Sequence, residues 1–117
     1  MNLLLVLAVG LGGAAGALLR ALAGRWIQSS FPFATLLVNV GGSFLLAAAY
    51  AWLPMESELA RALFGSGFCG ALTTFSTFIL ECVILARSGQ WKRAGLYLIL
   101  TLVLCCLASW TGFRLMA

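Results

Sequence analysis

The sequence predicts an all-α membrane protein with four transmembrane helices, the third of them broken near the middle of the membrane. Hydrophobic residues make up 63% of the 117 residues and charged residues only 9%, whereas a soluble domain carries about 25% charged residues. Four apolar segments approach or exceed the ~17–20 residues that a helix needs to cross a bilayer. We expect a single domain over residues 1–117, with spans at about 3–20, 33–53, 62–86 and 94–113.

The first two spans are marked by small residues and by prolines. Glycines recur through the first span, which stops at Arg20, and small residues at such spacing let helix backbones approach closely. The second span lies between Pro32 and Pro54 and contains Asn39, the one amide in the middle of a span. Because an amide in hydrocarbon needs hydrogen-bond partners, Asn39 either donates to an anion or clamps two helices together.

The third span owes its expected break to the run Gly67–Phe78. This run holds two glycines and four hydroxyl side chains, those of Thr73, Thr74, Ser76 and Thr77. Hydroxyls and neighbouring helices can satisfy the backbone groups that a break frees, and irregular backbone at membrane depth lines a cavity or an ion path. Glu81, the lone acid within a span, is a functional candidate for the same reason. The third span therefore indicates transport.

The fourth span carries a polar stripe. Tyr97, Thr101 and Cys105 are spaced four apart and share a helix face, and Thr35 and Asn39 make a similar pair on the second span. Two such stripes either face each other across a narrow path or consist of hydroxyls bonded to their own helices.

Two further features suit an anion. Phe75 and Phe78 are three apart and point the same way if a helix resumes after the break. The edge of an aromatic ring carries partial positive charge, so the pair could contact an anion, although ordinary packing also explains it. Arg20 either attracts anions to the end of the first span or reaches out to lipid headgroups.

Charge counting predicts an orientation. Four spans place both termini on one side, and the first and third connections share the other side. That side carries five basic residues against two on the side of the termini: Arg20, Arg25, Arg87, Lys92 and Arg93 against Arg61 and Arg114. The positive-inside rule then favours cytoplasmic connections and external termini. Four spans are too few to enclose a pore, so we expect a dimer.

Enzyme and metal-centre motifs are missing from the sequence. There is no histidine, the four cysteines form no C-x-x-C pair, and neither a P-loop nor a G-x-S-x-G motif is present. Catalysis is therefore not expected.

Three motifs together resemble the small fluoride-channel family, called Fluc or CrcB. The third-span run G-F-C-G-A-L-T-T-F-S-T-F at residues 67–78 is similar to the family's most specific signature. Residues 12–20 are similar to its first-span glycine motif ending in arginine, and residues 35–44 to its second-span T-L-x-x-N-x-x-G-x-F motif. The resemblance covers essentially the whole chain.

The resemblance implies an antiparallel dual-topology dimer with two pores in the inner membrane of a prokaryote, through which toxic fluoride leaves the cytoplasm passively. It implies that Phe75 and Phe78 contact fluoride by their ring edges and that Asn39 donates a hydrogen bond beside them. The backbone carbonyls of Gly70 and Thr73 would hold a structural Na⁺ on the dimer axis. Arg20 would lie in the entry region, and Thr74, Ser76, Thr77 and Glu81 would line the polar path. The stripe residues Thr35, Tyr97 and Thr101 complete the set of candidate pore residues.

The sequence departs from the family in the fourth span and in its charge balance. Leu104 and Cys105 stand where the family often has Gly-Ser, and a thiol is a weaker donor than a hydroxyl. The five-to-two charge split favours one orientation, so the partner is either a second copy or an oppositely oriented relative within the membrane lipid. A proton-coupled small multidrug transporter is the alternative, but it needs a carboxylate in the first span, where residues 3–19 have none. A non-transporting membrane assembly subunit is the third candidate.

Overall fold

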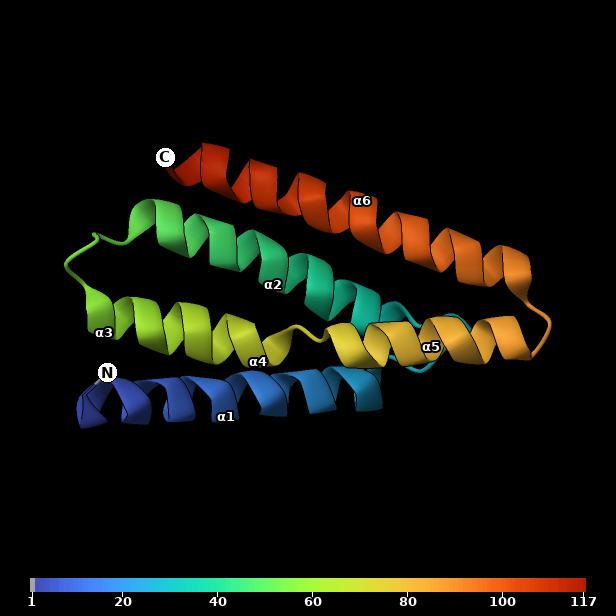
Figure 1. Ribbon diagram of the computed structural model, residues 1–117, viewed down its shortest axis with the longest axis horizontal. Coiled ribbons are helices and arrows are strands. Elements are labelled where there is room, and N and C mark those ends of the chain that lie inside the picture. Colours follow the sequence, from blue (N-terminus) through green and yellow to red (C-terminus); the bar gives the residue numbers. More distant parts are fainter. Residues whose placement is uncertain (1) are drawn as a thin grey trace.

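The computed structural model describes residues 2–117, and every regular element in that range is a helix (Figure 1). Three long helices are continuous, namely α1 (Leu3–Trp26), α2 (Phe33–Trp52) and α6 (Trp91–Met116). The remaining crossing consists of four consecutive pieces, namely α3 (Glu58–Ala60), the π-helical η1 (Arg61–Cys69), α4 (Gly70–Leu72) and α5 (Phe75–Arg87). Together these make four stretches long and apolar enough to cross a membrane, which confirms the predicted fold class at that level.

The rods lie side by side and share one long axis (Figure 1). The principal extents are 49 × 28 × 23 Å, and the longest of these matches a bilayer of about 40–45 Å including its headgroups. Connections 27–32 and 88–90 meet at one end, which we call the basic end, and both termini lie at the other (Figure 1). The outward faces of the rods are rich in exposed leucine, valine and isoleucine, as lipid contact requires.

Three of the four crossings extend beyond the spans expected from the sequence, whereas α2 matches its expected span. α1 does not stop at Arg20 but continues to Trp26, because the Arg20 side chain turns inward and finds a partner within the bundle. The third crossing begins at Glu58, and α6 runs from Trp91 to Met116. Hydropathy marks only the apolar centre of each rod, whereas helical hydrogen bonding continues through its polar ends.

Glycines bring α1 directly against the backbone of the third crossing. A Cβ atom on Gly12 would collide with the carbonyl oxygen of Leu63, and one on Gly16 with that of Phe68. The expected close approach of helices is therefore confirmed at these two positions, which are four residues apart and form a small-residue contact surface. Gly10, on another face of α1, has open space beside it and takes no part.

Aromatic rings organise the core at the basic end of the molecule. Tyr97 is fully buried, and the rings of Phe31 and Phe78 meet it edge to face at centroid distances of 5.5 and 5.2 Å. These three side chains come from α6, the 27–32 connection and α5. They therefore fix the position of α5 after the interruption of the third crossing.

The Gly16 contact yields a stability prediction. We expect Gly16→Ala to lower the free energy of unfolding by about 1–3 kcal/mol, the usual cost of overpacking, because the new methyl group meets backbone that cannot rotate away. The measurement is thermal unfolding in detergent, followed by size-exclusion chromatography.

Gly24→Ala is the matched control, because Gly24 lies on the same helix and no atom lies within 4 Å of the position that a Cβ would take there. It should be neutral or slightly stabilising, since alanine favours helix more than glycine does. Equal unfolding temperatures for the two variants would contradict the proposed contact.

Candidate functional site

The third crossing loses its helical geometry at two residues. Thr73 has φ −81° and ψ 153°, and Thr74 has φ −149° and ψ 121°, so both are extended. α5 restarts with Thr74 as its N-cap, whose Oγ1 accepts a hydrogen bond from the N–H of Thr77 at 3.3 Å. Two extended residues leave several backbone groups without a helical partner, and each of these groups needs another one.

Asn39 satisfies both backbone groups of Thr74. Its Nδ2 donates to the Thr74 carbonyl oxygen at 3.0 Å, and its Oδ1 accepts from the Thr74 N–H at 2.7 Å. Asn39 therefore joins α2 to the third crossing, as expected for an amide that clamps two helices together. An amide nitrogen carries two protons, so one N–H of Asn39 remains for another acceptor.

Arg20 satisfies a third group at the interruption. Its Nε donates to the Ala71 carbonyl oxygen at 3.0 Å, an oxygen whose helical donor would have been the Phe75 N–H. The alternative that Arg20 reaches out to headgroups is therefore wrong. Its cation is held against the interrupted helix.

Three carbonyl oxygens at the interruption accept no hydrogen bond from residues 2–117, those of Gly70, Leu72 and Thr73. The Thr74 N–H, which would otherwise reach back to Gly70, is taken by Asn39. Free carbonyl oxygens at an unwound helix suit a hard cation such as Na⁺. One chain offers three of them, which is fewer than such an ion takes, so the donor set fits only if a second chain completes it.

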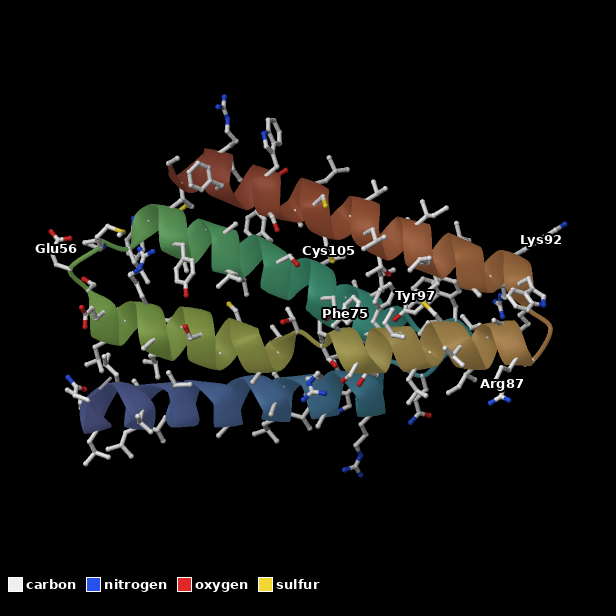
Figure 2. All side chains as sticks on the ribbon, viewed as in Figure 1. Glu56, Phe75, Arg87, Lys92, Tyr97 and Cys105 are labelled. Atoms are coloured by element: carbon white, nitrogen blue, oxygen red, sulfur yellow. The ribbon has the colours of Figure 1, made fainter. Side chains whose placement is uncertain are left out.

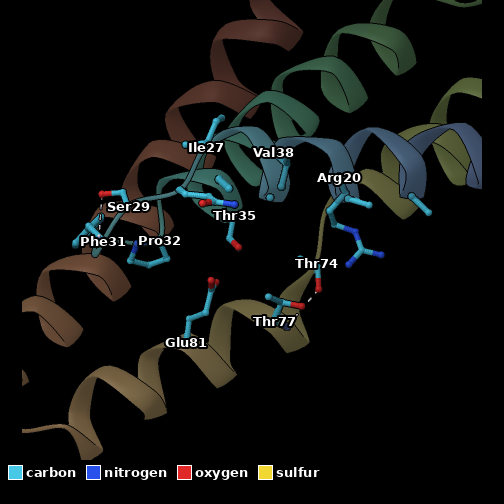
Figure 3. A pocket seen from close by; sticks show the side chains of 15 residues that line it. Arg20, Ile27, Ser29, Phe31, Pro32, Thr35, Val38, Thr74, Thr77 and Glu81 are labelled. Atoms are coloured by element: carbon cyan, nitrogen blue, oxygen red, sulfur yellow. Dashed lines mark hydrogen bonds between the residues drawn. The ribbon is translucent and has the colours of Figure 1, made fainter.

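A polar cavity of about 520 Å³ leads from the basic end down to this interruption (Figure 3). We call it the polar vestibule. Its wall includes the polar side chains of Arg20, Gln28, Thr35, Thr77 and Glu81. Figure 3 shows the Glu81 carboxylate and the Thr35 hydroxyl facing the same space. The vestibule therefore brings one cation, one acid and several hydroxyls to the interrupted backbone.

A hydrogen bond from α6 fixes the position of the Glu81 carboxylate. The hydroxyl of the buried Tyr97 donates to Glu81 Oε1 at 3.0 Å. This bond links α6 to α5. It gives the carboxylate a hydrogen-bond donor, which a carboxylate within a membrane span needs.

A second cavity, of about 260 Å³, lies on the other side of the interruption. We call it the phenyl pocket, because Phe75 and Phe78 line it together with Asn39, Thr101 and Cys105. The two rings meet at a centroid distance of 5.9 Å with an interplanar angle of 64°. Phe78 is 2% exposed, whereas Phe75 is 71% exposed and forms an open wall of the pocket.

Thr101 brings an unpaired hydroxyl to the phenyl pocket. Its Oγ1 is buried and has no hydrogen-bond partner within residues 2–117, and the residue is 3% exposed. Leaving such a group unsatisfied costs about 1–3 kcal/mol. The hydroxyl is therefore an unused hydrogen-bond donor buried beside this pocket.

The two predicted polar stripes share one cavity only in part. Thr35 lines the vestibule, whereas Asn39, Thr101 and Cys105 line the phenyl pocket. Tyr97 is fully buried and lines neither cavity. Asn39 of the α2 stripe thus meets Thr101 and Cys105 of the α6 stripe in the phenyl pocket, and Thr74 of the interrupted backbone lines both cavities.

Ser76 is a second departure from the predicted polar path. It is exposed, lines neither cavity, and makes a hydrogen bond of 3.4 Å only with the Thr74 hydroxyl. It follows the N-cap of α5, where a helix turns successive side chains to different sides.

Some residues of the site were not predicted. Gln28 and Ser29 from the 27–32 connection line the vestibule, and the Ala71 carbonyl receives Arg20. The polar composition of residues 20–32 was the available signal, but it does not say which helix the connection approaches. At the opposite end, Arg61 caps α2 through the Leu53 carbonyl at 3.0 Å and lies 4.4 Å from the centroid of the Tyr50 ring.

Comparison with known proteins places the chain in a family. Residues 7–113 match the family described as "CrcB-like protein, Camphor Resistance (CrcB)". A protein named "Fluoride-specific ion channel FluC" from Shewanella sp. (strain ANA-3) is 46% identical over 121 residues, covering 98% of this chain and 96% of the relative.

Relatives with the same name occur in other bacteria. The one from Shewanella frigidimarina is 47% identical over 116 residues, covering 94% of each chain. The one from a Nitratiruptor species is 43% identical over 109 residues, covering 89% of this chain and 85% of the relative. The match to the family over nearly its whole length shows that this chain belongs to the CrcB-like family.

Proposed function

We propose that the protein is a fluoride-selective channel through which fluoride leaves the cytoplasm passively. The observation that carries the proposal is the phenyl pocket, where two phenylalanine rings, Asn39 and Thr101 come together beside an interrupted helix. Its relatives are named as fluoride-specific channels. The protein is a multi-pass protein of the bacterial inner membrane, and its role as a conduit requires no enzymatic step.

Fluoride is small and strongly hydrated, so a pore must replace its water with fixed donors. The Thr101 hydroxyl and the free N–H of Asn39 are two such donors, and the rims of Phe75 and Phe78 add partial positive charge. None of these groups carries a full charge that would hold the ion too tightly to leave. The cavity of about 260 Å³ in one chain is wide enough for any halide, so we expect discrimination against larger halides to come from the fixed donors and from the narrower path that a second chain would complete.

The conduction path we infer runs from the vestibule to the phenyl pocket past Thr74, which lines both. Arg20 attracts the anion to the interrupted backbone, and hydroxyls of Thr35 and Thr77 replace bulk water on the way. The interruption lies near the middle of the membrane in this arrangement.

A second chain completes the pore in our proposal. Phe75 is 71% exposed, and the phenyl pocket is open on its side, so one protomer cannot seal a path from lipid. An antiparallel dimer of dual topology repeats the same wall twice and yields two pores. The partner is a second copy or an oppositely oriented relative.

The same dimer would complete a structural Na⁺ site. Each protomer contributes the free carbonyl oxygens of Gly70 and Thr73, and two protomers double that number. A cation there would hold the two interrupted helices together by oxygen ligands.

A proton-coupled multidrug transporter is the alternative. Such a transporter needs a carboxylate in its first span, and α1 has no acid. Glu81 is the acid within the bundle, and it is hydrogen-bonded to Tyr97.

Fluoride efflux from liposomes containing the purified protein tests the function directly. We expect rapid release of fluoride, slow release of chloride, and no dependence on a pH gradient. If fluoride leaves these vesicles no faster than it leaves protein-free vesicles, the channel proposal is overturned. Proton-driven export of an organic cation would instead favour the multidrug transporter.

The ring edges yield the first prediction for conduction. We expect Phe75→Ile to lower fluoride efflux at least tenfold, roughly 1.4 kcal/mol in the barrier, because an aliphatic side chain has no electropositive rim. The measurement is the initial efflux rate at equal protein density. Phe64→Ile is the matched control, since Phe64 is also an exposed phenylalanine on the third crossing but lies outside the phenyl pocket. Unchanged efflux in Phe75→Ile would remove this ring from the mechanism.

The hydrogen bonds between Asn39 and Thr74 yield the second prediction for conduction. Asn39→Asp loses the donor to the Thr74 carbonyl and the N–H available to an anion, and adds negative charge to the pocket. We expect efflux to fall to the level of empty vesicles while the dimer persists in size-exclusion chromatography. If Asn39→Asp conducts normally, the amide is structural only.

The charge distribution yields a prediction for orientation. Reporter fusions to the C-terminus should be detected mainly outside the cytoplasm, because four basic residues at the basic end outweigh Arg61 and Arg114 at the other even when Arg20, which is bonded within the bundle, is left out. Such an orientation would make the partner an oppositely oriented relative. The measurement compares a reporter active only in the cytoplasm with one active only outside it. Equal signals would instead support one chain inserted in both orientations.

A further inference from the structure

An apolar groove lies between α5 and α6 beside the turn that joins them. Its volume is about 340 Å³, and it is lined by Cys82, Val83, Ala86, Trp91, Ala94, Gly95 and Leu98. We call it the α5–α6 groove. Gly95 keeps the groove open, because no atom lies within 4 Å of the position a Cβ would take there. The groove plays no part in the vestibule or the phenyl pocket.

Two cations flank the end of this groove at the membrane surface. Arg87 ends α5 and Lys92 is the second residue of α6, and Figure 2 shows both side chains extending away from the bundle. Arg93 behaves differently, since it folds back to the Ser30 hydroxyl at 3.3 Å and lies 5.9 Å from the centroid of the Phe31 ring. Arg87 and Lys92 are therefore available to an external anion.

The length and position of the groove match one leaflet of a bilayer. From Trp91 to Leu98, at ~1.5 Å per residue, it extends roughly 10 Å along α6, and half of the ~30 Å hydrocarbon core is about 15 Å. Trp91 is 72% exposed beside the two cations, the position that interfacial aromatic residues take. An acyl chain entering at Trp91 would follow the groove while its headgroup stays between the cations.

We propose that the α5–α6 groove binds an anionic phospholipid. Arg87 and Lys92, which extend on opposite sides of the groove's end in Figure 2, attract its phosphate-containing headgroup by their charge, and one acyl chain lies over Gly95. Charge complementarity selects the anionic lipid over a zwitterionic one, and the open space at Gly95 admits the chain. The proposal does not depend on fluoride conduction.

Native mass spectrometry of the full chain tests the proposal, with phosphatidylglycerol or phosphatidylcholine added to the detergent at equal mole fraction. We expect phosphatidylglycerol to be retained preferentially. Arg87→Gln should weaken its retention about fivefold, the contribution of one basic residue near an anionic surface. Gly95→Leu fills the groove and should reduce retention of the lipid at least as much.

Matched controls separate the groove from general effects. Gly10→Leu makes the same change at another glycine with open space, and Arg114→Gln removes a cation at the opposite end of the molecule. Both should retain phosphatidylglycerol like the unmodified protein. Equal retention of the two lipids, or unchanged retention in Gly95→Leu, would overturn the proposal. Loss of the dimer in Gly95→Leu would also overturn it, because a second copy would then cover the groove.

Discussion

The hydrogen bonds between Asn39 and the backbone of Thr74 are the interaction on which the site depends. Two extended residues in an apolar bundle free backbone groups that have no water to bind. Asn39 satisfies the N–H and the carbonyl of Thr74, and Arg20 satisfies the carbonyl of Ala71. With these groups satisfied, the chain can separate a polar vestibule from a phenyl pocket by only two residues.

Close helix packing keeps this arrangement in register. Gly12 and Gly16 allow α1 to touch the backbone of the third crossing, which brings Arg20 within reach of Ala71. On the other side, the edge contacts of Phe78 with Tyr97 set the direction of α5. The positions of the charged and polar groups therefore depend on contacts made by small and aromatic residues some distance away.

The sequence was a good guide to the helices and to which residues gather around the interruption. Apolar length predicts four spans, and the cluster of glycines and hydroxyls at residues 67–78 singles out the third. The division into two cavities was not predictable, because helical spacing tells which residues share a face but not which faces meet. Tyr97 shares a stripe with Thr101, yet it is buried against Glu81, while Thr101 lines the phenyl pocket. The inward turn of Arg20 depends likewise on a backbone carbonyl, which no residue pattern reveals.

The vestibule has an electrical consequence. A space of about 520 Å³ that opens at the basic end would, when filled with water, carry the potential of the solution into the protein and leave the membrane voltage to fall mainly beyond Thr74. For a monovalent anion, an interior potential of about −100 mV is worth roughly 2.3 kcal/mol in the outward direction. That energy corresponds to about a fiftyfold concentration ratio at equilibrium. The cell's own voltage would thus drive expulsion without ATP or a coupled ion.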